Sequence, residues 1–397
     1  MSVPGTVPLS SLVMFMKNGT TAGQNQEGRG LPVTRIETIA DGTINLNRVR
    51  HVQLTDGDAI KWSLAPGDIL LSHINSVEHI GKSAIYVGVP NRLIHGMNLL
   101  LLRPNQNVVL PEFLHFGLRS AGVRAKMKAR CKQAVNQASI NQKELGQIEL
   151  TLPKLDEQHR MVDLLSRAEG IVRLRSEAQQ KAAELVPAIF LDMFGDPRTN
   201  PKRLPVYALG DLMVSPPTLG TMAKPSASQA KWLDLRVANI QGGKLTLDDR
   251  KWLELSEKET DRFQLVGGDV VLARAIGSLD HLGKAVVVYP DSDWTFDSHL
   301  MRLRFDPLRL LPEWFVPYLS SQGGRAEFLK HTRHSAVQFN INGKEIRKLQ
   351  IPLPALEAQK QFCARTEEIR SITTQQAAAT AKAEFVFQSL LSSAFKS

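Results

Sequence analysis

The chain has 397 residues, 43% of them hydrophobic, which is enough to bury two or three compact cores and excludes a largely disordered protein. Its 49 lysines and arginines exceed its 39 acidic residues, and the formal net charge of +10 favours a polyanionic partner such as nucleic acid. Two cysteines exclude a disulfide framework and cysteine-rich zinc sites, and no long apolar run predicts a membrane span, so we expect a soluble protein of the reducing cytoplasm.

The strongest feature of the sequence is an internal duplication at a shift of about 200 residues. The matching segments follow one another in the same order in both halves. In chain order they are Arg35-Ile36 with Arg236-Val237, Gly67-Asp68 with Gly268-Asp269, Gly81-Lys82 with Gly283-Lys284, Ala84-Ile85-Tyr86-Val87 with Ala285-Val286-Val287-Val288, and Leu110-Pro111-Glu112 with Leu311-Pro312-Glu313. The two copies are therefore predicted to fold alike.

Each copy has the pattern of an α+β module. A short apolar run follows each Gly-Asp pair, at Ile69–Leu71 and Val270–Leu272, and a further apolar run follows each Gly-Lys pair. Such runs, separated by glycine, proline and asparagine, predict strands, and a helix is expected after each Leu-Pro-Glu. The strand order does not follow from the sequence.

Each module is followed by a long helical pattern that starts after a proline, Pro153 or Pro354. A helix from about Asp156 to Met193 would be roughly 57 Å long, and Pro187 is expected to interrupt or kink it. The predicted apolar stripes are Leu164, Ala168, Ile171, Leu174, Ala178, Ala182, Leu185 and Ile189 in the first helix, and Ile369, Ile372, Ala379, Ala383, Val386 and Leu390 in the second. Core packing within one domain would explain a single stripe, but two related stripes favour helices that pair with each other.

These patterns predict an α+β protein with two similar domains separated by long helices that pair as an antiparallel coiled coil with approximate two-fold symmetry. The predicted segments are a first module at 1–153, a first spacer helix at 154–194, a linker at 195–205, a second module at 206–354 and a second spacer helix at 355–397.

Two segments of each module carry side chains suited to DNA. Six basic residues and no acidic ones lie between Arg119 and Lys132, which suits phosphates, and the polar loop that follows offers amides and hydroxyls for base edges. Another polar loop follows each Gly-Asp segment. The first-module candidates are His73, Asn75, His79, Lys82, Arg124, Lys126, Lys128, Arg130, Gln133, Asn136, Gln137 and Asn141. The second-module candidates are Arg274, Ser278, His281, Lys284, Arg325, Arg333, His334, Gln338 and Asn342.

Some of these candidates are identical in both copies, namely Lys82 and Lys284, Gln137 and Gln338, and Asn141 and Asn342. Two modules that read different bases need different readers. The shared residues therefore have a structural alternative, which is to shape the loops or to hold phosphates.

Patterns for catalysis are missing from the sequence. Ser215-Pro216-Pro217-Thr218 lacks the aromatic residue of an adenine methyltransferase motif, and Pro290-Asp291 lacks the acidic and lysine partners of a nuclease. Gly81-Lys82-Ser83 is similar to the end of a phosphate-binding loop, but Ser76 stands where that motif needs glycine. The ten histidines show no metal-binding spacing. We expect no catalytic residue, metal or cofactor in this chain.

Three further segments carry a resemblance to a known family: Gly19-Thr20-Thr21 with Leu31-Pro32-Val33, the run from Pro153 to Arg160, and Met193–Pro197 with Asn200-Pro201. With the duplication, they make nearly the whole chain similar to the specificity subunits of type I restriction-modification systems. The second helix departs from the pattern, since Ala358-Gln359 replaces the Glu-Gln pair.

The resemblance implies that each module is a target-recognition domain reading one half of a split DNA target, and that the helices hold the domains apart. It implies two methyltransferase subunits and restriction subunits as partners, with S-adenosylmethionine on the methyltransferase and ATP and magnesium on the restriction subunit. A stand-alone DNA-binding regulator and a non-catalytic assembly scaffold are the alternatives. The bases read and the spacer length do not follow from the sequence.

Overall fold

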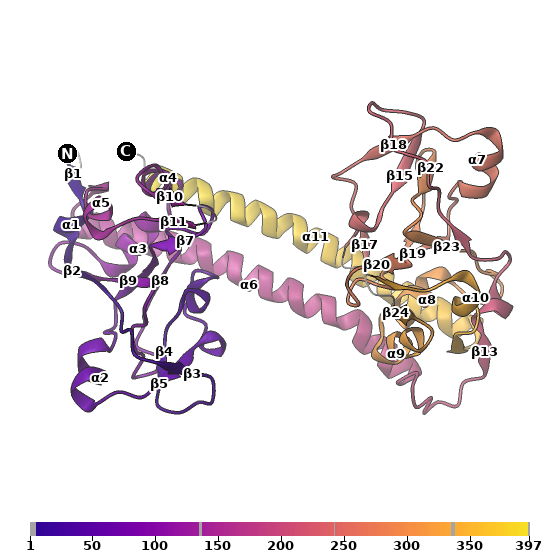
Figure 1. Cartoon of the computed structure of the whole chain (residues 1–397), viewed down its shortest axis with the longest axis horizontal. Helices are drawn as coiled ribbons and strands as arrows, with labels where there is room; N and C mark the ends of the chain where they lie inside the picture. Colours follow the sequence, from indigo (N-terminus) through magenta and orange to yellow (C-terminus); the bar gives the residue numbers. More distant parts are fainter. Residues whose placement is uncertain (1–4, 135–136, 242, 335–337, 396–397) are drawn as a thin grey trace. The chain divides into compact units, whose positions relative to one another are not determined.

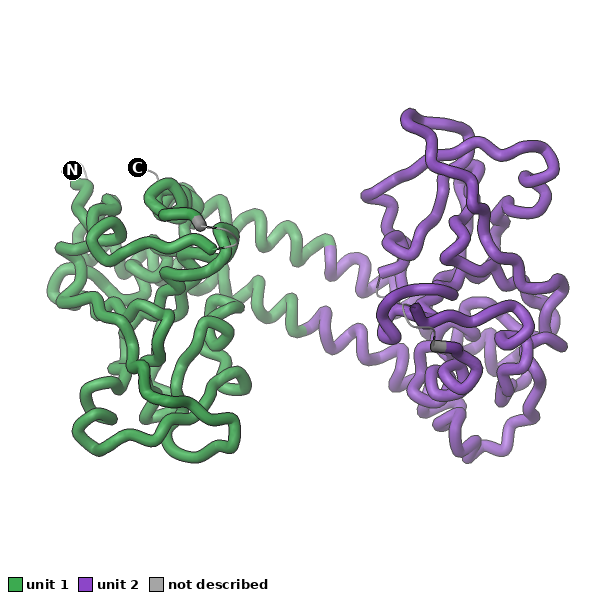
Figure 2. Tube along the Cα trace, viewed as in Figure 1, with its two compact units in different colours: residues 1–177, 378–397 green, residues 178–377 purple. Residues whose placement is uncertain are grey.

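The computed structural model describes residues 5–134, 137–241, 243–334 and 338–395, and the chain forms two compact units. Unit 1 comprises residues 1–177 and 378–397, and unit 2 comprises residues 178–377 (Figure 2). Each unit therefore contains one sequence module and a part of each long helix. The predicted segments differ from these units because each long helix was predicted as a segment of its own, whereas both units contain a part of each helix. No described helix is long and apolar enough to cross a membrane.

The centre of unit 1 is a four-stranded antiparallel sheet with the order β2-β9-β6-β8 (Figure 1). Side chains of the two inner strands alternate between the faces: Ile69 and Leu71 belong to one buried cluster and Leu70 to another. Because both faces are covered, the inner strands read as continuous apolar runs. The strands are β2 (Val13–Asn18), β6 (Ile69–Ser72), β8 (Ser83–Ile85) and β9 (Leu99–Pro104).

Two short helices, α3 (Pro111–Arg119) and α4 (Ala121–Ala129), pack on one face of this sheet. Pro111 at the first position of α3 suits a helix start, and the Ser120 hydroxyl accepts a hydrogen bond from the Val123 amide to cap α4. The expectation of a helix after Leu-Pro-Glu is confirmed. Phe113 and Leu114 fill the cluster between α3 and the sheet.

The remaining elements of unit 1 surround this layer. Strand β1 pairs with β12, and β3, β5 and β4 form a small sheet in that order. The elements are β1 (Gly5–Pro8), α1 (Leu9–Leu12), β3 (Gln24–Asn25), β4 (Leu31–Val33), η1 (Ile36–Ile39), η2 (Leu46–Arg48), β5 (Arg50–Val52), α2 (Asp56–Trp62), β7 (Ile74–Asn75), β10 (Lys132–Ala134), β11 (Gln137–Ser139), α5 (Gln142–Gly146) and β12 (Glu149–Leu152).

Unit 2 repeats the same sheet as β14-β23-β19-β21 with helices α8 (Pro312–Ser320) and α9 (Gln322–Lys330). The register corrects one part of the sequence alignment. Ala84 lies opposite Leu70, whereas Val286 lies opposite Val271, so the equivalent of Ala84 is Val286 and not Ala285. The loop before this strand is one residue longer in unit 2. The strands are β14 (Thr218–Leu219), β19 (Asp269–Ala273), β21 (Ala285–Val288) and β23 (Leu300–Leu303).

Most other elements of unit 2 have counterparts in unit 1. The hairpin β16-β17 and strand β22, however, have no counterpart strand among the described residues of unit 1, and the small sheet has the order β18-β15-β22. The other elements of unit 2 are β13 (Val206–Ala208), η3 (Leu209–Leu212), β15 (Trp232–Leu235), η4 (Val237–Asn239), β16 (Ile240–Gln241), β17 (Lys244–Leu245), β18 (Lys251–Leu253), α7 (Glu257–Phe263), β20 (Ala275–Ile276), β22 (Trp294–Phe296), β24 (Arg333–His334), β25 (Phe339–Asn340), α10 (Gly343–Ile346) and β26 (Gln350–Pro352).

The long helices are α6 (Leu155–Phe194) and α11 (Leu356–Ala394). In unit 1 the start of α6 packs with the end of α11, where Leu165 and Phe387 share a buried cluster. In unit 2 the end of α6 packs with the start of α11, and the rings of Phe190 and Phe362 lie 5.6 Å apart. The predicted antiparallel pairing is therefore confirmed. Of the predicted interruption or kink at Pro187, the interruption is wrong, because Pro187 lies inside α6 without ending it.

The predicted stripes coincide only in part with the buried side of each helix. Leu164, Ile171, Leu174 and Leu185 are 47 to 60% exposed, whereas Leu165 and Phe190 are buried. The periodicity identified an apolar face, but burial also depends on the module against which the helix packs. Aromatic side chains outside the stripe, such as Phe190, fill that contact because their area is large.

A buried glutamine joins the start of each long helix to its own module. The Gln158 amide accepts a hydrogen bond from the Leu110 amide at 2.9 Å and donates to the carbonyls of Val108 at 3.1 Å and Pro153 at 2.9 Å. Gln359 makes the same three contacts with Leu311, Arg309 and Pro354, all at 2.9 Å. Both glutamines are 0% exposed. Ala358 therefore leaves the helix entry unchanged, because the glutamine makes the contact.

Candidate nucleic-acid interface

The two candidate loops of the first module form one sheet. Strand β7 lies in the loop after the Gly-Asp segment, β11 lies in the later polar loop, and they pair in the order β10-β11-β7. Ala138 lies opposite both Gln133 and Asn75. Segments more than 50 residues apart in sequence therefore present their side chains side by side, which the sequence did not predict.

The second module has the equivalent sheet in the order β20-β25-β24. Phe339 lies opposite both Ile276 and His334, in the place that Ala138 occupies between Asn75 and Gln133. One cross-strand row is thus Asn-Ala-Gln in the first module and Ile-Phe-His in the second. We call these three-stranded sheets the reading sheets. Phe339 was missed by the sequence reasoning, although its replacement of Ala138 between two copies of one module was a usable signal.

A buried aspartate at the start of an inner strand pairs with an arginine near the end of the neighbouring strand in each central sheet. The Asp68 carboxylate accepts two hydrogen bonds from Arg103, both at 2.7 Å, and a third from the Ala65 amide. Asp269 does the same with Arg304, at 2.7 and 2.8 Å, and with Val266. The Gly-Asp segments shared by the two copies therefore have a structural role.

Arg124 and Arg325 hold the loops rather than extend from them. The Arg124 guanidinium donates to the carbonyl of Glu78 at 3.2 Å, and Arg325 donates to the carbonyls of Leu279 and Leu282. Each arginine therefore ties α4 or α9 to the loop before Gly81 or Gly283. Both glycines have φ near +77°, where a β-carbon is strained, and this turn returns the chain to the sheet.

The shared asparagines also shape the backbone. The Asn141 side chain caps α5 by accepting from the Glu144 amide at 2.8 Å, and Asn342 caps α10 by accepting from Lys344 and Glu345. This capping role explains why both copies have asparagine here, and it agrees with the alternative that shared residues shape the loops.

The first module leaves several candidates at the surface. Gln133, Gln137, Arg130 and His79 are exposed and Lys128 is half-buried. His79 shares a hydrogen bond of 2.8 Å with Ser76, Lys126 donates to the Glu149 carbonyl at 3.2 Å, and Lys82 donates to the Ala40 carbonyl at 3.0 Å. The Asn75 amide donates to Ser72 at 3.2 Å. Asn136 lies outside the described residues.

His73 differs from the other candidates because it is only 8% exposed. Burial lowers the pKa of its imidazole, so the neutral form prevails near pH 7. Its carbonyl accepts from the Ile140 amide and thereby joins the two loops. The structure therefore places His73 behind the reading sheet and not at its surface.

In the second module Arg274 donates to the Ser298 carbonyl at 3.0 Å, and the Ser278 carbonyl accepts from the His281 amide. The Lys284 ammonium lies 2.6 Å from Nδ1 of His281. Gln338 is exposed, and the side chain of His334 lies outside the described residues.

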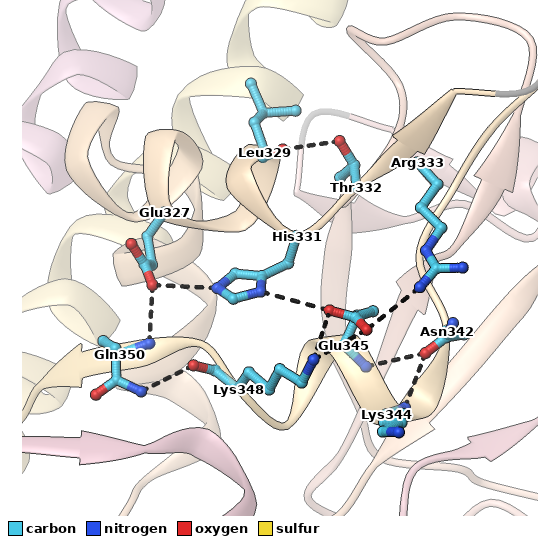
Figure 3. Close-up of polar contacts among 10 residues, drawn as sticks. All are labelled: Glu327, Leu329, His331, Thr332, Arg333, Asn342, Lys344, Glu345, Lys348 and Gln350. Atoms are coloured by element: carbon cyan, nitrogen blue, oxygen red, sulfur yellow. Dashed lines mark hydrogen bonds and ion pairs between the residues drawn. The ribbon is translucent and has the colours of Figure 1, made fainter.

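A charged network lies at the base of β24 (Figure 3). The His331 ring lies between Glu327, with Nε2 3.5 Å from Oε1, and Glu345, with Nδ1 3.8 Å from Oε2. Arg333 and Lys348 also contact Glu345, at 3.5 and 3.1 Å. Hydrogen bonding from Lys348 lowers the pKa of Glu345, which keeps that carboxylate charged. This network fixes where the second reading sheet leaves α9.

The chain is similar to proteins of type I restriction systems. The model of the type I restriction modification DNA specificity domain matches residues 6–184. A specificity subunit assigned to the MjaX type I restriction enzyme of Methanocaldococcus jannaschii is 46% identical over 165 residues, 41% of this chain and 39% of that protein. Both matches indicate similarity to type I specificity subunits, and each covers less than half of this chain.

Likeness to type I specificity subunits extends over both units. The StySPI specificity subunit of Salmonella potsdam is 24% identical over 419 residues, which cover 98% of this chain and 88% of that protein. A chain from a solved type I R-M system has a TM-score of 0.59 at 17% identity, with 99% of this chain and 98% of that chain covered. This structural likeness concerns the fold. The match to the M. jannaschii protein spans about two fifths of that relative's length.

The described residues contain no group of three or more histidine, cysteine, aspartate or glutamate side chains arranged to hold a metal ion. The segment after Gly81-Lys82-Ser83 is strand β8 and not a helix, so it differs from the strand, loop and helix of a nucleotide-binding loop. The arrangement offers hydrogen-bonding and charged surfaces for recognition.

Proposed function

We propose that this chain is the DNA-sequence-reading subunit of a type I restriction-modification enzyme and that it recognises a bipartite target without a catalytic centre of its own. Each module reads one half of the target. The paired helices α6 and α11 fix the separation of the half-sites and leave an unread spacer between them.

The observation that carries this proposal is that the two modules share their buried features but differ in their reading sheets. The buried features coincide in the two modules, including Asp68 with Asp269 and Gln158 with Gln359. The cross-strand rows differ, with Ala138 in one module and Phe339 in the other on the central strand of the reading sheets. A scaffold that binds the same partner twice has no need of that difference, whereas a reader of two unlike half-sites requires it.

The chemistry of the exposed residues fits DNA. The amides of Gln133 and Gln137 can donate to and accept from base edges, and such contacts discriminate between bases. Lys128 and Arg130, on the adjoining end of α4, suit phosphate oxygens, which position the protein without reading sequence. The steep salt dependence of phosphate contacts separates this function from that of a protein-binding scaffold.

The proposal includes two methyltransferase subunits and restriction subunits as partners, with S-adenosylmethionine held by the methyltransferase and ATP and magnesium by the restriction subunit. Exposed apolar side chains on the helices support a protein partner. Leu174 is 60% exposed and Phe385 is 73% exposed, both on the parts of the helices that lie in unit 1. Exposed apolar surface of this kind on a helix favours protein association.

The test is to express the chain with an active methyltransferase of the same system in a host without adenine methylation, and to map methylated adenines by single-molecule sequencing. Two short half-sites around a fixed unread gap are expected. A continuous motif, or tight site binding by the chain alone with no methylation from an active partner, would favour a stand-alone regulator.

A module exchange makes the test sharper. Replacing residues 206–354 by the second module of a related specificity subunit should change one half-site and preserve the other half-site and the gap. Lengthening α6 and α11 together by four residues, about 6 Å of helix, should change the gap alone. An unchanged gap after that insertion contradicts the spacer role of the helices.

A further inference from the structure

Unit 1 contains a pocket that the proposed base reading does not use. It lies between the turn before β8, helices α3 and α4, and the end of α11, and it brings three cationic side chains to one place. The residues that matter for its chemistry are Lys82, Ser83, Arg119, Arg124 and Asp41.

The pocket has an excess of positive charge. Arg119 pairs with Glu169 at 2.5 Å, and Asp41 pairs with Arg48 at 3.0 Å, so those charges are balanced. Lys82 and Arg124 donate only to the backbone carbonyls of Ala40 and Glu78, and neither has a carboxylate partner among the described residues. Two cations therefore lack a counter-charge, and neutral carbonyls satisfy only part of their donors.

The wall of the pocket also holds a buried donor without a partner. Ser83 is 1% exposed and its hydroxyl makes no hydrogen bond with any described residue, although its carbonyl accepts from the His115 ring. The Nε of Arg124 is likewise buried without an acceptor. Buried polar atoms are normally hydrogen-bonded, so the unpaired donors of Ser83 and Arg124, together with the uncompensated charges of Lys82 and Arg124, indicate a ligand with several anionic oxygens.

We propose that this pocket binds a phosphate group. A phosphate supplies negative charge for Lys82 and Arg124 and an acceptor for the Ser83 hydroxyl. Neither a carbonyl-rich nor an apolar ligand would compensate both cations. The site differs from a nucleotide-binding loop because its donors are side chains from the hairpin and from α3 and α4, and not backbone amides at a helix start.

The second module lacks this site, which argues against a merely structural cluster common to the fold. The register makes Ala285 the equivalent of Ser83, so the hydroxyl is missing there. Arg119 is replaced by Ser320 at the equivalent end of α8, and Arg325 uses both terminal nitrogens on loop carbonyls. The duplicated fold thus needs neither the hydroxyl nor the additional arginine.

Two sources can supply the phosphate. Lys82 ends the loop whose strand β7 belongs to the first reading sheet, so the DNA backbone beside the first half-site is the favoured source. In that form the inference rests on the proposed function. A free phosphate compound is the other source, and it would make the pocket a regulatory site in unit 1.

The experiment uses the full chain and three variants. Lys82→Gln removes an unbalanced charge, and Ser83→Ala removes only the hydroxyl. Lys330→Gln in unit 2 is a charge-matched control, because that lysine is exposed and already pairs with Glu327. Thermal unfolding of each variant verifies that the chain remains folded. The first arm titrates the protein with inorganic phosphate at low salt. The second arm measures binding to a duplex with the mapped target, bearing one ethylated phosphate at a time.

If DNA is the source, one ethylation beside the first half-site weakens binding of the parent and of Lys330→Gln but not of Lys82→Gln. The salt slope of Lys82→Gln then falls by about one. If a free compound is the source, Lys82→Gln and Ser83→Ala weaken inorganic phosphate binding by about tenfold or more, as for lost charge-assisted contacts, and leave the DNA slope unchanged. Variants that match the parent in both arms overturn the proposal. Loss of target binding by the parent itself refutes the proposed function, and the first arm still decides the pocket.

Discussion

The buried glutamines at the helix entries allow a quantitative prediction. Replacing Gln158 with leucine removes three hydrogen bonds of 2.9 to 3.1 Å from a side chain that is 0% exposed. The Leu110 amide then lacks its acceptor, which costs about 1 to 3 kcal/mol for a buried donor. The two carbonyls lose one donor each at about 0.5 to 1 kcal/mol, because a carbonyl retains a second lone pair. We expect a total loss of about 3 kcal/mol in the free energy of unfolding unit 1.

Urea unfolding gives the free energy, and hydrogen exchange measured by mass spectrometry assigns it to a unit. Exchange should accelerate at the start of α3 in Gln158→Leu and at the start of α8 in Gln359→Leu, each without change in the other unit. The control is Glu157→Ala, since Glu157 is exposed and Ala358 occupies its place in the second helix. A loss below about 1 kcal/mol in Gln158→Leu, or an equal loss in the control, refutes the reasoning.

Three further predictions concern stability and assembly. Burial, together with the nearby charge of Arg119, lowers the pKa of His115 to about 4, although the hydrogen bond to the Ser83 carbonyl opposes this shift. Between pH 6.5 and 4 the unfolded chain therefore binds more protons than the folded chain. The free energy of unfolding should fall by up to about 3 kcal/mol over that range, and by less in His115→Gln. A pH profile that is equally steep in both proteins contradicts this assignment. Asp269→Asn should cost about 3 kcal/mol in urea unfolding, since it breaks a buried bidentate pair with Arg304; a loss under 1 kcal/mol would show that the pair is dispensable. Phe385→Ser should weaken copurification of the methyltransferase at unchanged stability, and undiminished association would exclude that surface.

The internal duplication, the α+β modules and the two long helices were accessible from the sequence. These features depend on local patterns: apolar runs after Gly-Asp, proline before each helix, and a repeat that preserves the order of the segments. Comparison of the two copies also showed which candidate residues are identical in both modules. The structure assigns Asn141 and Asn342 to helix caps, as expected when two unlike readers share a residue.

Only the tertiary structure decided the register, the buried side of the helices and the composition of the reading sheets. A one-residue change in loop length moved the equivalent of Ala84 to Val286. The Gly81-Lys82 and Gly283-Lys284 pairs already carry that shift, but the short apolar runs that follow match at either shift, and only the strand register chose between them. Periodicity placed Leu174 in a stripe, yet that side chain is exposed, since burial is set by the partner surface. Pairing of Asn75 with Ala138 likewise depends on contacts between distant segments. Local pattern fixes which elements form, and long-range packing decides which side chains meet.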